Sequence, residues 1–368
     1  MGEPSILTFG RPIMPDLDQM KDLLGEAISE EWLSNFGVLH GRLQRKMSAM
    51  MGGPTRLVSS GTMALMMALK MADLPDGAEV ITSPLSFAAT VQAITWCGYR
   101  PVFADVDPET LNLCPQAVKA AMTPDTGAIL PVHFVGVPCD VEALAAIAAE
   151  HGVWLAYDAA HAFLLELNGQ AISQWGDVSA FSLHATKLMH TGEGGAVVLP
   201  DTAHTSWSRM RNFGLNGGRM AGPGTNAKLS EAQAAMGLAV LSKLDAEIAH
   251  RQALRRTFDA ALAGIPGVRP HYRRPGATDS LIYYVLRMTP ELRERIFLEL
   301  SQQRIFARDH FPMLYGPGTY LPQARLVTTA ERPVAPQVGP EVLCLPFHSG
   351  VTDKDVDRIA HIIQTVST

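Results

Sequence analysis

Short apolar runs alternate with helical stretches through residues 56–199, and this rhythm restricts the fold more than any other feature of the chain. Runs of this length that are apolar throughout are typical of strands buried on both faces, as in a mostly parallel sheet covered by helices on each side. We expect strands at residues 79–82, 101–104, 128–132, 153–157, 178–183 and 196–199. We expect the helices between them at residues 62–71, 87–97, 115–122 and 141–151.

The two ends of the chain have a different pattern. Asp16 is a predicted N-cap for an amphipathic helix, and residues 213–228 are glycine-rich and predict a long loop. A continuous helical pattern at residues 230–263 leads into a mixed series of strands (near 268, 281–286, 343–345) and helices (290–302 and the segment after Thr352). The sequence therefore predicts an α/β protein with a large domain at residues 1–240 and a smaller α+β domain at residues 241–368.

Composition excludes several classes of function. The chain has 368 residues, 47% of them hydrophobic, and a net charge of −6 without a basic run, so we expect no nucleic-acid partner. No apolar run approaches the roughly 20 residues that cross a bilayer, and the N-terminus carries no secretory signal pattern, so no membrane association is expected. The four cysteines lack metal or redox spacing and predict buried thiols in a reducing compartment, which favours the cytoplasm.

Lys187 lies in a polar turn between two predicted strands, with glycines crowding the turn's exit at residues 192–195. A lysine at the edge of a buried strand loses hydration, which lowers its pKa and makes it a nucleophile toward carbonyls. Asp158 ends another predicted strand, and the carboxyl ends of such strands line the ligand sites of parallel sheets. A lysine that forms a Schiff base and an acid that keeps a pyridine nitrogen protonated are what pyridoxal phosphate requires from a protein.

A phosphate site is predicted at the start of the helix that follows residue 60. Backbone N–H groups at a helix N-terminus favour an anion, and Gly61 allows a phosphate to approach closely. Ser60 and Thr62 flank this glycine, although a serine or threonine before a helix is ordinarily just a cap. Ser182 and His184 flank the lysine turn and would add donors to the same phosphate.

Together these segments resemble the DegT/DnrJ/EryC1/StrS aminotransferases, which use pyridoxal phosphate to aminate nucleotide-linked keto-sugars. The resemblance covers nearly the whole chain and is specific as an ordered set of motifs. The matching residues are 60–65 (SGTMAL), 84–90 (PLSFAAT), 105–107 (DVD), 158–162 (DAAHA), 182–187 (SLHATK), 191–195 (TGEGG), 211–214 (RNFG), Asn226 and 231–235 (EAQAA). The resemblance implies the type I aminotransferase fold and a homodimer with its active sites at the subunit interface.

The resemblance also implies individual roles. Lys187 and Asp158 would be the catalytic pair, with Lys187 bound covalently to the cofactor and later moving a proton, and Asp158 paired with the pyridine nitrogen. His161 would lie beside the phenolic oxygen and Phe87 would stack on the ring. The phosphate would be held by Ser60, Gly61, Thr62 and Ser182, with Asn226 reaching it from the other subunit.

For the substrate, the resemblance implies a nucleotide-linked deoxysugar such as dTDP-4-keto-6-deoxyhexose, aminated by glutamate or glutamine for polysaccharide or natural-product sugar synthesis. The candidate substrate-binding residues are Asn35, Phe36, His184, Arg308 and His310. For His184 the family motif supplies no specific role. Phe347 and His348 are weaker candidates for the same surface.

Four alternatives stay open at this stage. Some relatives carry histidine in place of the lysine and dehydrate the sugar, but Lys187 favours transamination. Others act on cyclitols or form aromatic amino acids. A metal-dependent hydrolase would use histidines 133, 161, 184 and 190 with Asp158, yet their spacing matches no metal motif, and no metal is expected. A non-catalytic sugar-binding protein would have no need of the lysine and the aspartate.

Overall fold

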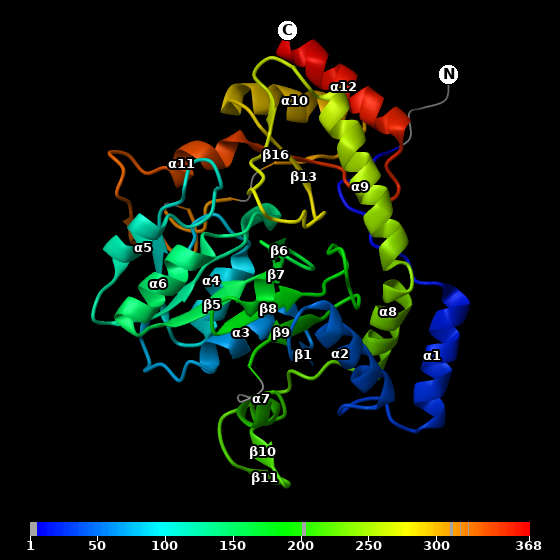
Figure 1. Cartoon of the computed structure of the whole chain (residues 1–368), viewed down its shortest axis with the longest axis vertical. Coiled ribbons are helices and arrows are strands. Elements are labelled where there is room, and N and C mark those ends of the chain that lie inside the picture. The colour runs from blue at the N-terminus through cyan, green and yellow to red at the C-terminus, as the bar shows by residue number, and fades with distance from the viewer. Residues whose placement is uncertain (1–5, 201–203, 310–311, 317, 323) are drawn as a thin grey trace.

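The computed structural model describes residues 6–200, 204–309, 312–316, 318–322 and 324–368 (Figure 1). The strands of the large central sheet are β1 (Thr55–Val58), β2 (Glu79–Thr82), β3 (Arg100–Ala104), β4 (Thr126–Leu130), β5 (Trp154–Asp158), β8 (Val178–Ser182), β9 (Gly195–Val198) and β15 (Leu326–Val327). Their order in space is β1-β9-β8-β5-β4-β2-β3-β15. Within this order β9 runs antiparallel to both of its neighbours, and the remaining pairs are parallel. The predicted α/β class with a mostly parallel sheet is confirmed.

Alternate side chains of each strand face opposite sides of the sheet, and helices cover both sides. On one face Val80, Leu130 and Ala156 pack against α3 (Gly61–Lys70), α4 (Ala88–Trp96) and Trp207 of α7 (His204–Met210). The other face, with Ile81, Ile129 and Leu155, is covered by α2 (Val38–Met50), α5 (Pro115–Ala121), α6 (Val141–His151) and α8 (Glu231–Leu241). This double cover explains why the strands are apolar throughout.

A small antiparallel sheet follows α8 in the chain. It consists of β12 (Arg269–Pro270), β13 (Tyr284–Arg287), β16 (Val342–Leu345) and β14 (Arg308–Asp309), in that order. It packs with helices α9 (Leu244–Ala261), α10 (Pro290–Gln302) and α12 (Asp353–Ser367), at the top of Figure 1. Two segments cross between the predicted domains: Leu7 pairs with Ile305, and β15 joins the large sheet. The boundary at residue 240 stays a prediction.

Of the finer predictions, two are wrong and one is confirmed. The helical pattern at residues 230–263 is broken into α8 and α9. The Ser242 hydroxyl donates to the Ala239 carbonyl (2.7 Å), and the Lys243 N–H donates to the Val240 carbonyl (3.0 Å). These bonds over three residues tighten the last turn of α8 and end the helix. The glycine-rich segment 213–228 contains a short hairpin of β10 (Leu215–Asn216) and β11 (Arg219–Met220). The helix capped by Asp16 is confirmed as α1 (Leu17–Ser29).

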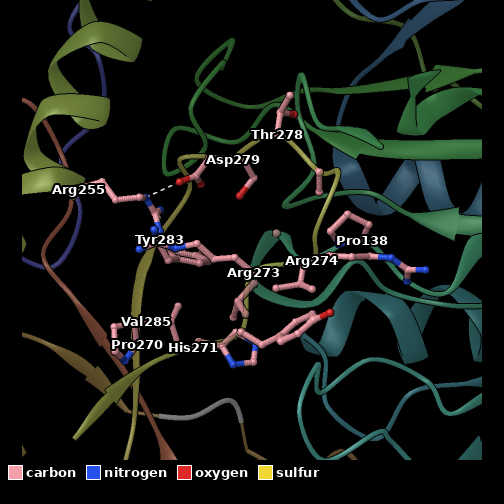
Figure 2. Close-up of a pocket in the computed structure, with 16 residues that line it drawn as sticks. Pro138, Arg255, Pro270, His271, Arg273, Arg274, Thr278, Asp279, Tyr283 and Val285 are labelled. Carbon is pink, nitrogen blue, oxygen red and sulfur yellow. Dashed lines mark hydrogen bonds and ion pairs between the residues drawn. The ribbon is translucent and has the colours of Figure 1, made fainter. Parts of the chain in front are cut away.

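A cavity of about 90 Å³ lies where the segment between β12 and β13 meets the turn at residues 135–138 (Figure 2). Its arginines are already engaged by the protein. Arg255 pairs with Asp279, Arg273 lies 2.5 Å from a carboxylate oxygen of Asp259, and Arg274 donates to the Cys139 carbonyl at 2.8 Å. We therefore regard this cavity as part of the joint between the two sheets.

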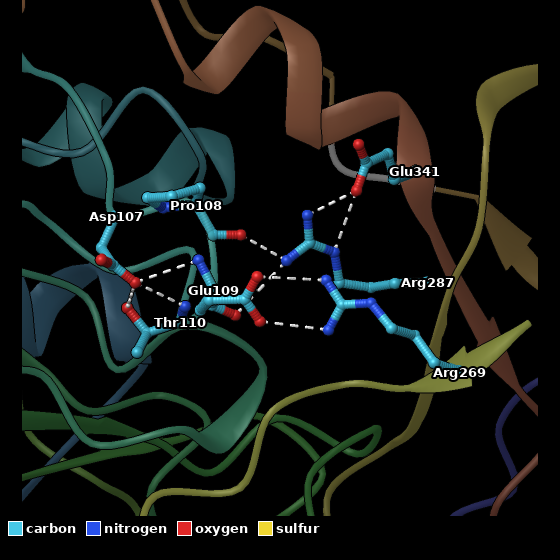
Figure 3. Close-up of polar contacts among 7 residues, drawn as sticks. All are labelled: Asp107, Pro108, Glu109, Thr110, Arg269, Arg287 and Glu341. Carbon is cyan, nitrogen blue, oxygen red and sulfur yellow. Dashed lines mark hydrogen bonds and ion pairs between the residues drawn. The ribbon is translucent and has the colours of Figure 1, made fainter. Parts of the chain in front are cut away.

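A second set of polar contacts fixes the same joint (Figure 3). Asp107 accepts hydrogen bonds from the N–H groups of Glu109 (3.0 Å) and Thr110 (2.8 Å), which shapes the loop that follows β3. Arg269 of β12 pairs with Glu109 at 3.1 Å. Arg287 of β13 is buried, donates to the Pro108 carbonyl and pairs with Glu341. Two arginines of the small sheet thus bind this loop through an ion pair and a hydrogen bond.

The four cysteine thiols are free. Cys97, Cys139 and Cys344 are buried as predicted, whereas Cys114 is only partly buried. Within the part of the chain that the structure describes, none of the helices combines the length and the apolar character needed to traverse a bilayer.

Candidate active site

Lys187 lies in the turn between β8 and β9, and backbone hydrogen bonds define that turn. Leu183 donates its N–H to the Gly194 carbonyl (2.9 Å), and Ala185 donates to Gly192 (2.7 Å). The N–H of Lys187 itself donates to the His184 carbonyl at 2.9 Å. The turn therefore holds the lysine at the carboxyl end of β8, as predicted from the sequence.

Asp158 is the last residue of β5 and is only 4% exposed. β5 and β8 are adjacent and parallel, so Asp158 and Lys187 lie at the same edge of the sheet. One carboxylate oxygen accepts the Thr90 hydroxyl (2.7 Å) and the other accepts the Ala160 N–H (3.1 Å). Burial raises the pKa of the Asp158 carboxyl, and these two hydrogen bonds and the charge of Lys187 act against that rise.

The start of α3 comes very close to the two strands that flank the lysine turn. A Cβ atom on Gly61 would lie 2.8 Å from the Cβ of Ser182, and a side chain on Gly195 would collide with the Ser60 carbonyl. Ser60 caps the helix by accepting the Met63 N–H at 3.1 Å. The N–H groups of Gly61 and Thr62 lie in the first turn, where an α-helix offers no internal acceptor. Glycine thus allows Ser182 to pack against this helix end, whose N–H groups favour an anion.

These three features meet in one cavity of about 420 Å³. Ten of the residues predicted for the site contribute to its lining: Ser60, Gly61, Thr62, Phe87, Asp158, His161, Ser182, His184, Lys187 and Arg308. Phe87 is 58% exposed, so its ring presents an open apolar surface to the cavity. His184 lies 2.9 Å from the Thr186 hydroxyl and 3.7 Å from the Glu193 carboxylate.

The remaining candidates lie elsewhere. Asn35 and Phe36 have left-handed backbone conformations in the connection before α2, where Arg211 stacks on the Phe36 ring at 4.3 Å. Asn226 is exposed and pairs with Asn212 near the β10–β11 hairpin. Phe347 and His348 are buried; the Phe347 ring lies 4.9 Å from the Arg255 guanidinium, and His348 contacts the Thr8 carbonyl (3.0 Å). His310 lies outside the described residues.

The sequence reasoning missed several residues at this site, four of which make notable contacts. Ser86 and Tyr283 line the cavity, Thr90 contacts Asp158, and Phe9 stacks on Tyr283 with ring centroids 5.6 Å apart. Ser86 and Thr90 belong to the same motif as Phe87, so their spacing of one helical turn was the available signal. Tyr283 directly precedes β13 of the small sheet and Phe9 lies in the N-terminal segment, so neither carries a local signal.

The histidines of the alternative metal site have other contacts. His133 is buried, stacks on Tyr157 (4.8 Å between centroids) and accepts the Cys139 N–H, while His190 contacts the Ile13 carbonyl (2.9 Å). Among the residues that the structure describes, no group of three or more histidine, cysteine, aspartate or glutamate side chains is arranged to hold a metal ion.

The residues present fit pyridoxal phosphate. The N–H groups of Gly61 and Thr62 at the start of α3 lie beside Ser182 at the same cavity, which suits the phosphate. The exposed Phe87 ring suits a flat aromatic ligand, and the buried Asp158 carboxylate suits a cationic ring nitrogen. Burial lowers the pKa of Lys187 from 10.5 to about 8, with Asp158 opposing the change, which favours its nucleophilic form.

This lowered pKa predicts how the rate of covalent cofactor attachment depends on pH. Only the neutral amine attacks a carbonyl, so the rate of covalent attachment to the apo-protein should rise about tenfold per pH unit and level off above pH about 8. Borohydride trapping at timed intervals across this range would measure the rate. A rate that kept rising toward pH 10.5, the ordinary pKa of lysine, would show that Lys187 is not desolvated.

The known proteins that this chain resembles are aminotransferases, in agreement with the residues of this site. The model of the DegT/DnrJ/EryC1/StrS aminotransferase family matches residues 17–364. A dTDP-4-amino-4,6-dideoxy-D-glucose transaminase from Shigella dysenteriae is 32% identical, over 100% of this chain and 99% of its own. A GDP-perosamine synthase from Caulobacter vibrioides is 30% identical over 96% of each chain. The crystal structure of DesI with its TDP-sugar product superposes with a TM-score of 0.92 at 32% identity, covering 100% of this chain and 94% of that one.

Fold and comparisons together define an aminotransferase that depends on pyridoxal phosphate. Its sheet, its helix order and the expected type I aminotransferase architecture agree with those of the solved sugar aminotransferases. The chain belongs to the DegT/DnrJ/EryC1/StrS aminotransferase family.

Proposed function

We propose that this aminotransferase moves an amino group from glutamate or glutamine to the keto carbon of a nucleotide-linked 4-keto-6-deoxysugar. The observation that carries the proposal is the meeting of Lys187, Asp158 and the α3 N-terminus in one cavity. The substrate class is supported by the names of the relatives, several of which are 4-amino-sugar transaminases, and by the TDP-sugar product bound to DesI. One relative that contributes to a spore coat polysaccharide supports a role in surface polysaccharide synthesis.

Each side chain has a proposed task. Pyridoxal phosphate, when bound, supplies a reactive carbonyl carbon and a ring that takes up negative charge. The Lys187 amine holds the cofactor and then moves a proton to and from the substrate carbon. Asp158 stabilises the positive charge at the ring nitrogen, Phe87 stacks on the ring and His161 lies beside it. Residues 60–62 and Ser182 bind the phosphate.

Arg308 lines the cavity and contributes a positive charge, which favours an anionic substrate. Burial lowers the pKa of the neighbouring His161, and the charges of Lys187 and Arg308 lower it further, so this imidazole is neutral near pH 7. We propose that Arg308, with His184 and His310, contacts the nucleotide-linked sugar or the donor carboxylate.

We further propose that the enzyme is a cytoplasmic homodimer in which each subunit completes the other's site. Asn35, Phe36 and Asn226 are exposed and do not line this chain's own cavity, and the neighbouring Trp32 (52% exposed) and Leu33 (61%) present an apolar surface. In this proposal Asn226 reaches the cofactor phosphate of the partner, and Asn35 and Phe36 border its sugar.

Mixed dimers test this arrangement. Lys187→Ala and Asn226→Ala variants, each of low activity alone, should together recover about a quarter of wild-type activity after unfolding and refolding as a mixture. Half of the dimers would then be mixed, and one site in each would have both residues intact. If Asn226 serves its own subunit, mixing recovers nothing.

Product analysis tests the substrate. Incubation with dTDP-4-keto-6-deoxyglucose and ¹⁵N-glutamate should yield a sugar nucleotide that carries the label at C4, detected by mass spectrometry and NMR. A dehydrated sugar without nitrogen would contradict the aminotransferase reaction on this substrate. Labelling of a cyclitol or an aromatic product in place of the sugar nucleotide would overturn the proposed substrate class.

A further inference from the structure

Behind the proposed cofactor site, two hydroxyl groups form a buried chain that ends on Asp158. Ser86 lies just before α4, and Thr90 lies in the first turn of that helix. The Ser86 and Thr90 hydroxyls are 2.6 Å apart, and the Thr90 hydroxyl is 2.7 Å from Oδ2 of Asp158. All three residues are buried, with exposed fractions of 2%, 0% and 4%.

The direction of this chain follows from the chemistry of its end. An ionised carboxylate only accepts hydrogen bonds, so Thr90 must donate its single proton to Asp158. Ser86 must then donate to the remaining lone pairs of the Thr90 oxygen. The Ala160 N–H occupies Oδ1 at 3.1 Å. The carboxylate is therefore held through both oxygens, and its orientation is fixed by groups on two different segments.

The same hydrogen bonds decide the charge of Asp158. Burial raises the pKa of its carboxyl, whereas the hydrogen bond from Thr90 is the largest effect that lowers it. The neighbouring titratable groups are His133 and Cys139 beyond β4, His161 on the turn after β5, and Lys187 after β8. Burial keeps both imidazoles neutral and raises the pKa of the thiol, so before the cofactor binds Lys187 is the group that places a charge next to Asp158.

We propose that Ser86 and Thr90 are positioning residues that hold Asp158 ionised and aimed at the ring nitrogen of the cofactor, an inference that rests on the proposed role of Asp158. The cofactor site thus includes Thr90, which does not line the cavity, together with Ser86, which does. Phe87 and Thr90, three residues apart at the start of α4, serve the ring face and the ring nitrogen respectively.

The test is the protonation state of the ring nitrogen, measured by ¹⁵N NMR of holoenzyme loaded with ¹⁵N-labelled pyridoxal phosphate. Thr90→Val keeps the shape of the side chain and removes the donor that stabilises the carboxylate, so at a given pH the ratio of protonated to unprotonated ring nitrogen should fall by about 10- to 100-fold. The sign follows because a carboxyl with a raised pKa takes the proton from the ring, a transfer within the pair that does not itself depend on pH. Thr90→Ser restores the donor and should restore the wild-type ratio.

Ser86→Ala provides a second variant that leaves Thr90 in place, and a smaller shift in the same direction is expected. We also expect kcat of Thr90→Val to fall about 10- to 100-fold with KM for the donor nearly unchanged, as for a residue that acts through another. Borohydride labelling of Lys187 should be the same in every variant.

Two outcomes overturn the proposal and remain distinguishable. If Thr90→Val and Ser86→Ala keep the wild-type ratio while Asp158→Asn loses the nitrogen proton, the hydroxyl pair has no positioning role, and the proposed function stands. If Asp158→Asn also leaves the nitrogen protonated, the role of Asp158 fails and the hydroxyl chain loses its purpose with it.

Discussion

Replacing Lys187 with alanine is expected to lower kcat by at least about 10⁴-fold, because one amine both holds the cofactor and moves the proton. The variant should still fold and bind pyridoxal phosphate non-covalently, since the helix end at Gly61 and the Phe87 ring are untouched. Steady-state and single-turnover amination of the sugar nucleotide would measure the loss. Lys119→Ala is the matched control, because that lysine pairs with Glu150 on the surface and is 57% exposed.

Chemical rescue separates the loss of this amine from general damage. Small primary amines such as methylamine should restore part of the proton transfer in Lys187→Ala, because the space left by the side chain opens to the cavity. A Lys187→Ala variant that retained activity within tenfold of the wild type would contradict the assignment of this lysine.

Replacing Asp158 with asparagine is expected to lower kcat by about 10³-fold while the cofactor stays covalently attached. Asparagine has nearly the same shape but carries no negative charge, so it cannot stabilise a protonated ring nitrogen. Proton removal from the substrate carbon should become the slow step, and a deuterated donor should show a larger isotope effect than in the wild type. The rate would be measured by stopped-flow spectroscopy of the amino-donor half-reaction.

Asp125→Asn is the control for this change, because Asp125 is 69% exposed and pairs with Arg100 far from the cavity. Unchanged proton removal in Asp158→Asn would mean that the ring accepts charge without this carboxylate. That result would also remove the reason for the buried hydroxyl chain behind it.

Much of the fold could be predicted because local patterns and tertiary structure agree. β2 and α6 have the predicted limits, and the other predicted strands and helices of the large domain are present with ends shifted by a residue or two. α2 was not predicted, and its start explains why: Glu231, far away in the sequence, is fully buried and accepts the Leu39 N–H at 2.7 Å. Because the capping carboxylate belongs to α8, the sequence just before α2 contains no capping residue that would predict the helix.

The site divides in the same way. Lys187 and Asp158 could be placed together because each follows a predicted strand at one edge of the sheet. The Gly61 turn was predicted as the start of a helix, and the family resemblance assigned it to the same site. Tyr283 could not, because it reaches the cavity through the packing of the small sheet on the large one. The positions of Asn35 and Phe36 outside this chain's cavity depend on packing with Arg211, which local sequence does not report.

The most direct test of the account is to reduce the purified holoenzyme with borohydride and map the modified peptide. Before reduction we expect a visible absorption band of bound cofactor, and after it the band should disappear with the label on Lys187. Prior treatment with glutamate should remove the visible band and protect the lysine. A protein that binds pyridoxal phosphate but carries the label on another lysine, or that stays colourless with the cofactor in excess, would contradict the central claim.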